Sequence, residues 1–257
     1  MVARRRIRTL LAAGGAVVVV LGVGGCGSTD AAGAPVEEKS FAFSAGTLTV
    51  DSDNSELEIV PADIKDVRVS RQVEGWVFMG NGPEADWRME GGRLTLRVEC
   101  DGVASDCDSV HRIQVPRGVA VTVEDDNGKV TADGFDTALK ITADNGEVIV
   151  RNASGALDLS SGNGEVVVEG GTTSGQVVAR SDNGAVRLAL SAVPARVEAV
   201  SDNGEIDIAL PTGSASYDVD GRSDNGSVRI DVPTRKGSAH VVTARSDNGE
   251  VVVRSAN

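Results

Sequence analysis

The sequence predicts an all-β protein: a single-domain β-solenoid of about seven Asn-Gly repeats, preceded by an irregular N-terminal β cap. The first observation is a tripeptide, Asp-Asn-Gly six times and Gly-Asn-Gly once, that recurs at intervals of about 20 residues. The second is a period of two in the apolar residues on both sides of each tripeptide, which is typical of strands with one buried face. The third is composition, because aromatic residues make up only 3% of the chain, which suits a thin stacked core of small side chains.

Residues 1–25 are expected to be a lipoprotein signal peptide. A positive segment precedes an apolar run, 10–23, that is too short and too interrupted by glycine for a comfortable membrane span. The run ends at Val23-Gly24-Gly25-Cys26, which resembles a bacterial lipobox, whose cysteine receives a diacylglyceryl group and becomes the new N-terminus. The alternative is an ordinary secretory signal followed by a chance cysteine. The positive segment contains Arg4, Arg5, Arg6 and Arg8.

The small, polar and unpatterned residues 26–39 are typical of a flexible tether. With Cys26 lipidated, we expect the protein to be held on the extracytoplasmic side of the cell membrane by this lipid. Removal of residues 1–25 takes away four arginines and no acidic residue, so the excess of acidic over basic residues grows from 13 to 17. This charge argues against nucleic acid as a partner, because phosphates require a basic face.

Residues 40–115 are expected to form the cap. The segment 52–59 resembles a decayed repeat in which Ser55 replaces the usual glycine. Trp76, Phe78 and Trp87 are interpreted as the core of this cap, with an exposed aromatic patch as the alternative.

Two further cysteines, Cys100 and Cys107, are expected to form a local disulfide that closes the Asp101–Asp106 loop, as suits an exported protein. The alternative is a redox-active or metal-binding pair. Neither a Cys-x-x-Cys spacing nor a nearby pair of histidines supports that alternative.

Residues 116–257 are expected to form the solenoid, in which each repeat consists of a strand, a tight Asn-Gly turn, a second strand and a looser turn. The alternative is an antiparallel β meander, in which each Asn-Gly is a hairpin turn. The hairpin register would place Arg180 opposite Arg187 and Asp144 opposite Glu147, and directly opposed like charges are destabilising. The near-identity of successive repeats, together with the ability of stacked asparagine amides to form a ladder, favours the solenoid.

The recurring aspartates are the candidate cation site, because a stack of carboxylates would concentrate the oxygen ligands that Ca²⁺ prefers. The simpler interpretation is turn chemistry, since aspartate favours the position before Asn-Gly whether or not a metal binds. No cofactor is otherwise expected. These residues are Asp126, Asp144, Asp182, Asp202, Asp224 and Asp247.

Catalysis is not expected. The two histidines, His111 and His240, lie far apart in the sequence, and neither belongs to a recognisable nucleophile motif. A polysaccharide-active enzyme built on surface carboxylates is the weakest of the functional alternatives.

The segment Val115-Pro116-Arg117-Gly118-Val119-Ala120-Val121-Thr122-Val123, followed by Asn-Gly-Glu-Val-x-Val units, resembles the bacterial putative-adhesin family of unknown function, over residues 110–257. The resemblance implies a repetitive all-β envelope protein or lipoprotein without catalytic residues. We therefore expect a surface-exposed structural or adhesion protein that binds an unidentified envelope protein or glycan. The alternative is an accessory or sensor lipoprotein in envelope-stress signalling that binds a membrane partner near its own anchor.

Overall fold

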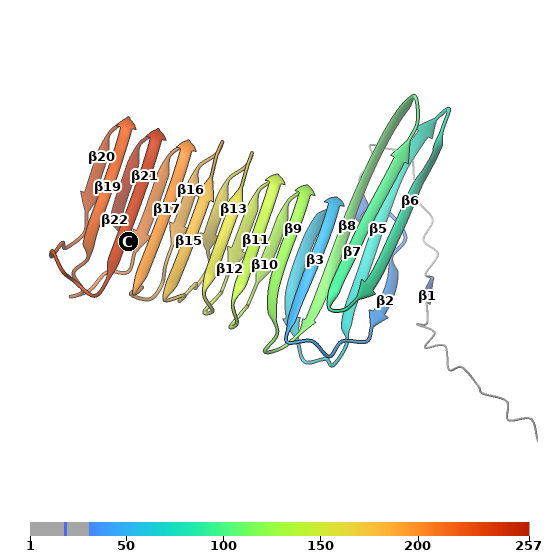
Figure 1. Ribbon diagram of the computed structural model, residues 1–257, viewed down its shortest axis with the longest axis horizontal. Helices are drawn as coiled ribbons and strands as arrows, with labels where there is room; N and C mark the ends of the chain where they lie inside the picture. Colours follow the sequence, from blue (N-terminus) through green and yellow to red (C-terminus); the bar gives the residue numbers. More distant parts are fainter. Residues whose placement is uncertain (1–17, 20–30, 257) are drawn as a thin grey trace, which may run out of the picture.

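The computed structural model describes residues 18–19 and 31–256, which form two long β-sheets packed face to face (Figure 1). The first sheet has twelve strands in the spatial order β1 (Val18–Val19), β2 (Glu37–Phe41), β5 (Val67–Phe78), β8 (Ala104–Pro116), β4 (Glu56–Ala62), β10 (Val130–Asp133), β12 (Val148–Arg151), β14 (Val166–Glu169), β16 (Val186–Ala189), β18 (Ile206–Leu210), β22 (Val251–Ser255) and β20 (Val228–Asp231).

The second sheet has ten strands in the spatial order β19 (Asp218–Asn225), β21 (Val241–Asn248), β17 (Arg196–Asn203), β15 (Gln176–Ser181), β13 (Leu157–Ser161), β11 (Leu139–Asn145), β9 (Ala120–Asn127), β3 (Thr47–Asn54), β7 (Arg93–Asp101) and β6 (Asn81–Glu90). The only helix among the described residues is a single 3₁₀ turn, η1 (Ala31–Gly33). None of the described residues forms a helix with the length and hydrophobicity needed to cross a bilayer.

Each repeat contributes one strand to each sheet, so the chain winds as a solenoid. β11 pairs with β13 in parallel, with Leu139 opposite Leu157, and β12 pairs with β14 in parallel, with Val148 opposite Val166. Equivalent residues of successive repeats therefore stack directly on each other. The predicted β-solenoid is confirmed, and the antiparallel meander is wrong for the repeats.

The core lies between the two sheets. It is built from every second residue of each strand, whose side chains point inward. Val148, Val166 and Val186 are fully buried in one sheet, and Leu139 and Val177 are buried opposite them in the other. Burying a valine or leucine side chain stabilises the fold by about 1.5–3 kcal/mol, so each coil gains stability only when its neighbours cover it.

The asparagines of the repeats form a continuous hydrogen-bonded ladder along one edge of the stack. The amide Nδ2 of Asn163 donates to Oδ1 of Asn145 at 2.8 Å, and Asn183 donates to Asn163 at 3.0 Å. The same amides also lie 3.3–3.4 Å from backbone carbonyls of the neighbouring coil, including that of Asp144. The ladder that the sequence predicted is thus present, and the aspartates contribute to it through their backbone oxygens.

The decayed repeat at 52–59 forms a true coil of the stack. β3 pairs in parallel with β9, with Asn54 opposite Asn127, and the Asn127 amide donates to Oδ1 of Asn54 at 3.1 Å. Ser55, in the position that glycine takes in later repeats, is buried and its hydroxyl lies 2.7 Å from that of Ser109. The sequence interpretation of this segment as a repeat is confirmed.

The last two coils do not follow the order of the chain. β21 and β22, from the seventh repeat, lie between the fifth repeat and the sixth, because β21 pairs with both β17 and β19, and β22 pairs with both β18 and β20. The sixth repeat, β19 and β20, therefore forms the free end of the stack (Figure 1). The repeats therefore do not stack in the order in which they occur in the sequence.

Candidate interaction site

Four long strands at the other end of the stack form an arm that projects past the coils (Figure 1). β5 and β8 contain 12 and 13 residues, whereas the first-sheet strands of the repeats contain four or five. β5 pairs antiparallel with β8 as far as Phe78 opposite Ala104, and β6 pairs antiparallel with β7 as far as Asn81 opposite Asp101. We call residues 72–87 and 98–111 the arm.

The end of the arm is held by close backbone contacts and by a disulfide. Cys100 of β7 and Cys107 of β8 are joined with a Cα–Cα distance of 6.5 Å, so the bond links the two sheets and confirms the predicted pairing. The Val103 N–H donates to the Phe78 carbonyl at 3.0 Å, which joins the two turns. At Gly80, a side chain would overlap the Asp101 carbonyl, so only glycine allows this close approach.

The outermost residues of the arm are large, apolar and exposed. The exposed fractions are 52% for Trp76, 57% for Phe78, 74% for Met79 and 78% for Val103, which are the four highest among the exposed large apolar residues of the described chain. We call these four residues the arm tip. Since such side chains gain about 1.5–3 kcal/mol each on burial, the gathering of four of them at one end of the arm makes the arm tip the candidate interaction surface.

The assignment of Trp76 and Phe78 to the core of the cap is therefore wrong, whereas that of Trp87 is confirmed. Trp87 is 7% exposed, and its ring meets Phe41 edge-on with centroids 6.3 Å apart. The Arg71 guanidinium lies 4.1 Å from the Trp87 ring centroid. A signal that distinguishes the two sets is present in the sequence, because Trp76 and Phe78 directly precede the glycine-rich turn 79–82, where the chain reverses at a tip.

The arm is strongly acidic. It carries seven acidic residues and no lysine or arginine, so the charges around its apolar tip are all negative. These residues are Glu74, Glu84, Asp86, Glu99, Asp101, Asp106 and Asp108. Such a charge favours basic groups and disfavours anionic groups next to the tip.

The first described residues before β2 are fastened to this arm. The backbone N–H of Ala31, which is fully buried, donates to Oδ2 of Asp108 at 3.0 Å, and the Gln72 amide donates to the Ala34 carbonyl at 2.9 Å. Cys26 lies outside the described residues.

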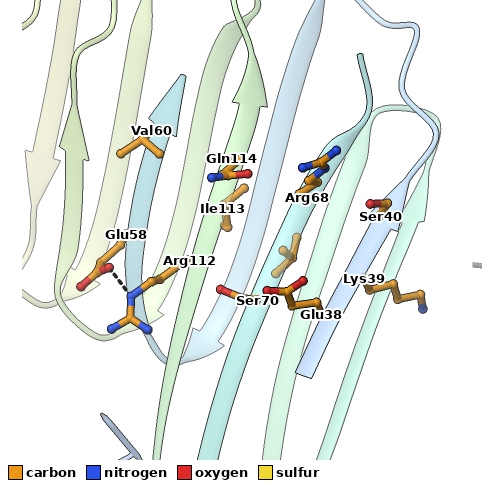
Figure 2. A pocket seen from close by; sticks show the side chains of 11 residues that line it. Glu38, Lys39, Ser40, Glu58, Val60, Arg68, Ser70, Arg112, Ile113 and Gln114 are labelled. Atoms are coloured by element: carbon orange, nitrogen blue, oxygen red, sulfur yellow. Dashed lines mark hydrogen bonds and ion pairs between the residues drawn. The ribbon is translucent and has the colours of Figure 1, made fainter. Parts of the chain in front are cut away.

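A shallow hollow of about 570 Å³ lies on the outer face of the first sheet, across β2, β5, β8 and β4 (Figure 2). Its charged side chains are of both signs, and the Arg112 guanidinium binds the Glu58 carboxylate at 2.6 Å. The hollow therefore has neither the apolar lining nor the single-sign charge that would select a ligand.

The structure does not bring the two histidines together. His111 lies on β8 and is fully buried, and burial lowers its pKa to about 4, with a smaller contribution from Arg71. His240 lies near the opposite end of the stack, where its Nδ1 is 2.9 Å from the Pro194 carbonyl oxygen. A neutral, buried imidazole without a neighbouring nucleophile is not an accessible general base.

The six repeat aspartates are all exposed and run along the asparagine ladder. Within residues 18–19 and 31–256, no group of three or more His, Cys, Asp and Glu side chains is arranged to hold a metal ion. Calcium binding along the ladder stays a prediction without support from this geometry.

Comparison with known proteins shows which family and which solved structures the chain resembles. A family model described as Toastrack DUF4097 matches residues 47–255. A crystal structure of a putative adhesin from Bacteroides fragilis shares 15% sequence identity, covers 86% of this chain and 97% of its own, and has a TM-score of 0.51. A putative cell adhesion protein from Clostridium sporogenes shares 11% identity over 86% of this chain and 99% of its own, with a TM-score of 0.40. No curated protein matches the chain.

Proposed function

Because the chain belongs to the Toastrack DUF4097 family, we propose that it is a non-catalytic interaction protein of the bacterial envelope, anchored by lipid on Cys26, that binds a protein partner through its arm tip. The observation that carries this proposal is the exposure of Trp76, Phe78, Met79 and Val103 together at the end of a disulfide-linked arm. Large aromatic side chains of this kind supply most of the binding energy in protein interfaces.

Charge favours a protein over the membrane surface as the occupant of the tip. The acidic side chains of the arm would be repelled by anionic headgroups, whereas arginine and lysine of a partner protein would be attracted. A glycan partner, as adhesion to a surface would require, is the other outcome of the experiment below. An adhesion role agrees with the description of the Bacteroides fragilis neighbour as a putative adhesin.

After crosslinking of intact envelopes and purification of the protein, the double variant Trp76→Ser/Phe78→Ser is expected to recover at least 10-fold less partner than the wild type. Each aromatic anchor of an interface is worth about 2 kcal/mol or more, so removal of two reduces capture strongly. Quantitative mass spectrometry of the recovered material measures the effect.

The matched control is Val193→Ser, because Val193 is an exposed apolar residue, 40% accessible, on a loop of the stack and away from the arm. It should leave recovery unchanged. Equal recovery by the tip variant and the wild type would show that the arm tip is not the contact. Recovery of wall polymer in place of protein would support the adhesion alternative.

The anchor has a separate test. Cys26→Ala is expected to move the protein from the membrane fraction to the medium or periplasm, since acyl chains contribute about 0.8 kcal/mol per buried CH₂ group and more than one chain is needed for stable attachment. Ser28→Ala in the tether is the control. Membrane fractionation with immunoblotting gives the answer, and a Cys26→Ala protein that still sediments with membranes contradicts the lipid anchor.

A second candidate function is that of an accessory lipoprotein in envelope-stress signalling. The contact between the Ala31 N–H and the Asp108 carboxylate favours it, because it keeps the arm near the lipid and thus near integral membrane proteins. Recovery of one membrane protein by the wild type, and its loss with the tip variant, would select this function over adhesion to a distant surface.

A further inference from the structure

The sixth repeat, at the free end of the stack, has an uncovered core. Val228 and Ile230 of β20 are 41% and 39% exposed, whereas Val251 and Val253, which stack beside them in β22, are fully buried. β19 and β20 are the last strands of their sheets, so one side of each strand carries unpaired backbone groups. Such an edge pairs readily with another strand.

The backbone groups that face outward can be identified from the ladder. The Val251 N–H donates to the Ser227 carbonyl, so Ser227, Arg229 and Asp231 direct their backbone groups to β22, and Val228 and Ile230 direct theirs outward. In the other sheet the Asp218 N–H donates to the His240 carbonyl. By the same alternation, Gly221 directs its backbone groups outward.

On each edge strand, one basic and one acidic residue flank a residue whose backbone groups point outward. Arg229 and Asp231 flank Ile230, and neither takes part in an ion pair within the described part of the chain. In the interior coils the corresponding face is paired, as in the ion pair of Arg254 with Asp207 at 3.0 Å. Asp220 and Arg222 flank Gly221 with the same alternation of charge, but they pair with each other at 2.8 Å, and Asp220 also pairs with Arg245 at 3.3 Å.

An antiparallel strand pair centred on Ile230 places Arg229 of each copy opposite Asp231 of the other. The equivalent pair centred on Gly221 places Asp220 opposite Arg222. Both centres are also residues with outward backbone groups, as a hydrogen-bonded antiparallel pair requires.

One two-fold axis satisfies both sheets at once. Gly221 and Ile230 face each other across the core, because a Cβ built on Gly221 would lie 3.5 Å from Cδ1 of Ile230 and 3.2 Å from Cγ1 of Val228. An axis that passes between the two copies of Ile230 and between the two copies of Gly221 therefore pairs β20 with β20 and β19 with β19 at the same time.

We propose that the sixth repeat binds a second copy of this chain end to end, around a two-fold axis that passes between the two copies of Ile230 and between the two copies of Gly221. The occupant is a second copy because the charge pattern is self-complementary, and an isologous contact requires that each surface match itself. The axis places the two arms at opposite ends of the dimer. Where the anchor proposed above holds, the two lipids point in opposite directions and the dimer joins facing membranes.

The test is sedimentation equilibrium of the full chain purified in a density-matched detergent. The wild type is expected to be dimeric at tens of micromolar. Arg229→Asp places like charges opposite each other twice, so it should weaken association roughly 30-fold. The charge exchange Arg229→Asp/Asp231→Arg should restore the dimer.

Arg88→Asp, at an exposed position on β6 at the far end, is the control and should not alter the mass. A monomeric wild type, or an Arg229→Asp variant that remains dimeric, overturns the proposal. Circular dichroism confirms that each variant is folded. The measurement depends neither on the lipid nor on the arm tip. The dimer proposal can therefore fail while the anchor and the tip contact hold, and the reverse is also true.

Discussion

Gly184→Ala is expected to lower the free energy of unfolding by about 3 kcal/mol or more, although it adds a single methyl group. A Cβ at this position would overlap the carbonyl oxygen of Gly164 and lie 2.6 Å from its carbon. Both are backbone atoms of the adjacent coil, fixed by strand pairing on either side, so the clash cannot be relieved by a rotamer change. Separation of the two coils would break the asparagine ladder and uncover the core.

The matched control is Gly175→Ala, since no heavy atom lies within 4 Å of a Cβ built at Gly175, which lies just before the next strand. Chemical denaturation followed by far-ultraviolet circular dichroism compares the two. Gly175→Ala should remain close to the wild type. Equal stability of both variants would show that the coils are not held at the separation that the structure gives them.

This glycine seam explains why the sequence predicts the stack so well. The last glycine of each tripeptide meets the same glycine of the next coil, as Gly204 meets Gly184, so the tripeptide recurs for a geometric reason. The valine columns follow from the same geometry, because equivalent residues stack in register. The near-identity of successive repeats, the asparagine ladder and the like charges that a hairpin register would oppose were therefore sufficient to choose the solenoid over the meander.

The order of the last two coils could not be predicted by that reasoning. The sixth and seventh repeats both carry Ser-Asp-Asn-Gly, so either could stack on Asn203 of the fifth repeat. They differ at two core positions, Ile230 against Val253 and Gly221 against Ala244, and at the second of these the sixth repeat has no side chain. A coil without a side chain at this position covers its neighbours poorly, which suits an end of the stack, but the difference of one methyl group is too small to assign from sequence.

The candidate site was the least predictable part for a different reason. A large aromatic side chain is expected to be buried because of its apolar area, but the face of the strand on which it lies decides whether it is covered. Trp76 and Phe78 lie opposite Asp106 and Ala104 on the outward face of β5, whereas Val67 and Val69 of the same strand face the core. The alternation that begins at Val67 and Val69 would place both aromatic residues outward, but only if one strand is known to continue as far as Phe78, and strand length is set by tertiary contacts.

Asp125→Ser is expected to stabilise the protein at pH 8 by about 2–4 kcal/mol and to leave its stability at pH 4 almost unchanged. Asp125 is 3% exposed and occupies the column in which Ser161, Ser181 and Ser201 donate to glycine carbonyls of the adjacent coil. Burial raises its pKa from 3.8 to about 7; the Ser52 hydroxyl opposes this rise, and Asp126, Asp53 and Asp144 reinforce it.

The direction of the pH dependence follows from the raised pKa. Because the folded state holds the proton of Asp125 more tightly than the unfolded state, wild-type stability is fully present below about pH 4 and falls until the pH passes about 7. Serine carries no charge, and its hydroxyl can donate to the Ser55 carbonyl, which lies beside Gly128 as the Gly146 carbonyl lies beside Gly164. The variant should therefore lose this part of the pH dependence.

Urea denaturation at a series of pH values from 4 to 8 measures the difference between the two proteins. Asp182→Ser, at an exposed ladder position, is the control and should show no comparable gain at pH 8. A difference between wild type and Asp125→Ser that stays constant over this range would mean that the carboxyl is ionised throughout. Contacts other than those described would then stabilise the ionised Asp125. Serine, which occupies the equivalent position in later repeats, would not be a better residue at this position.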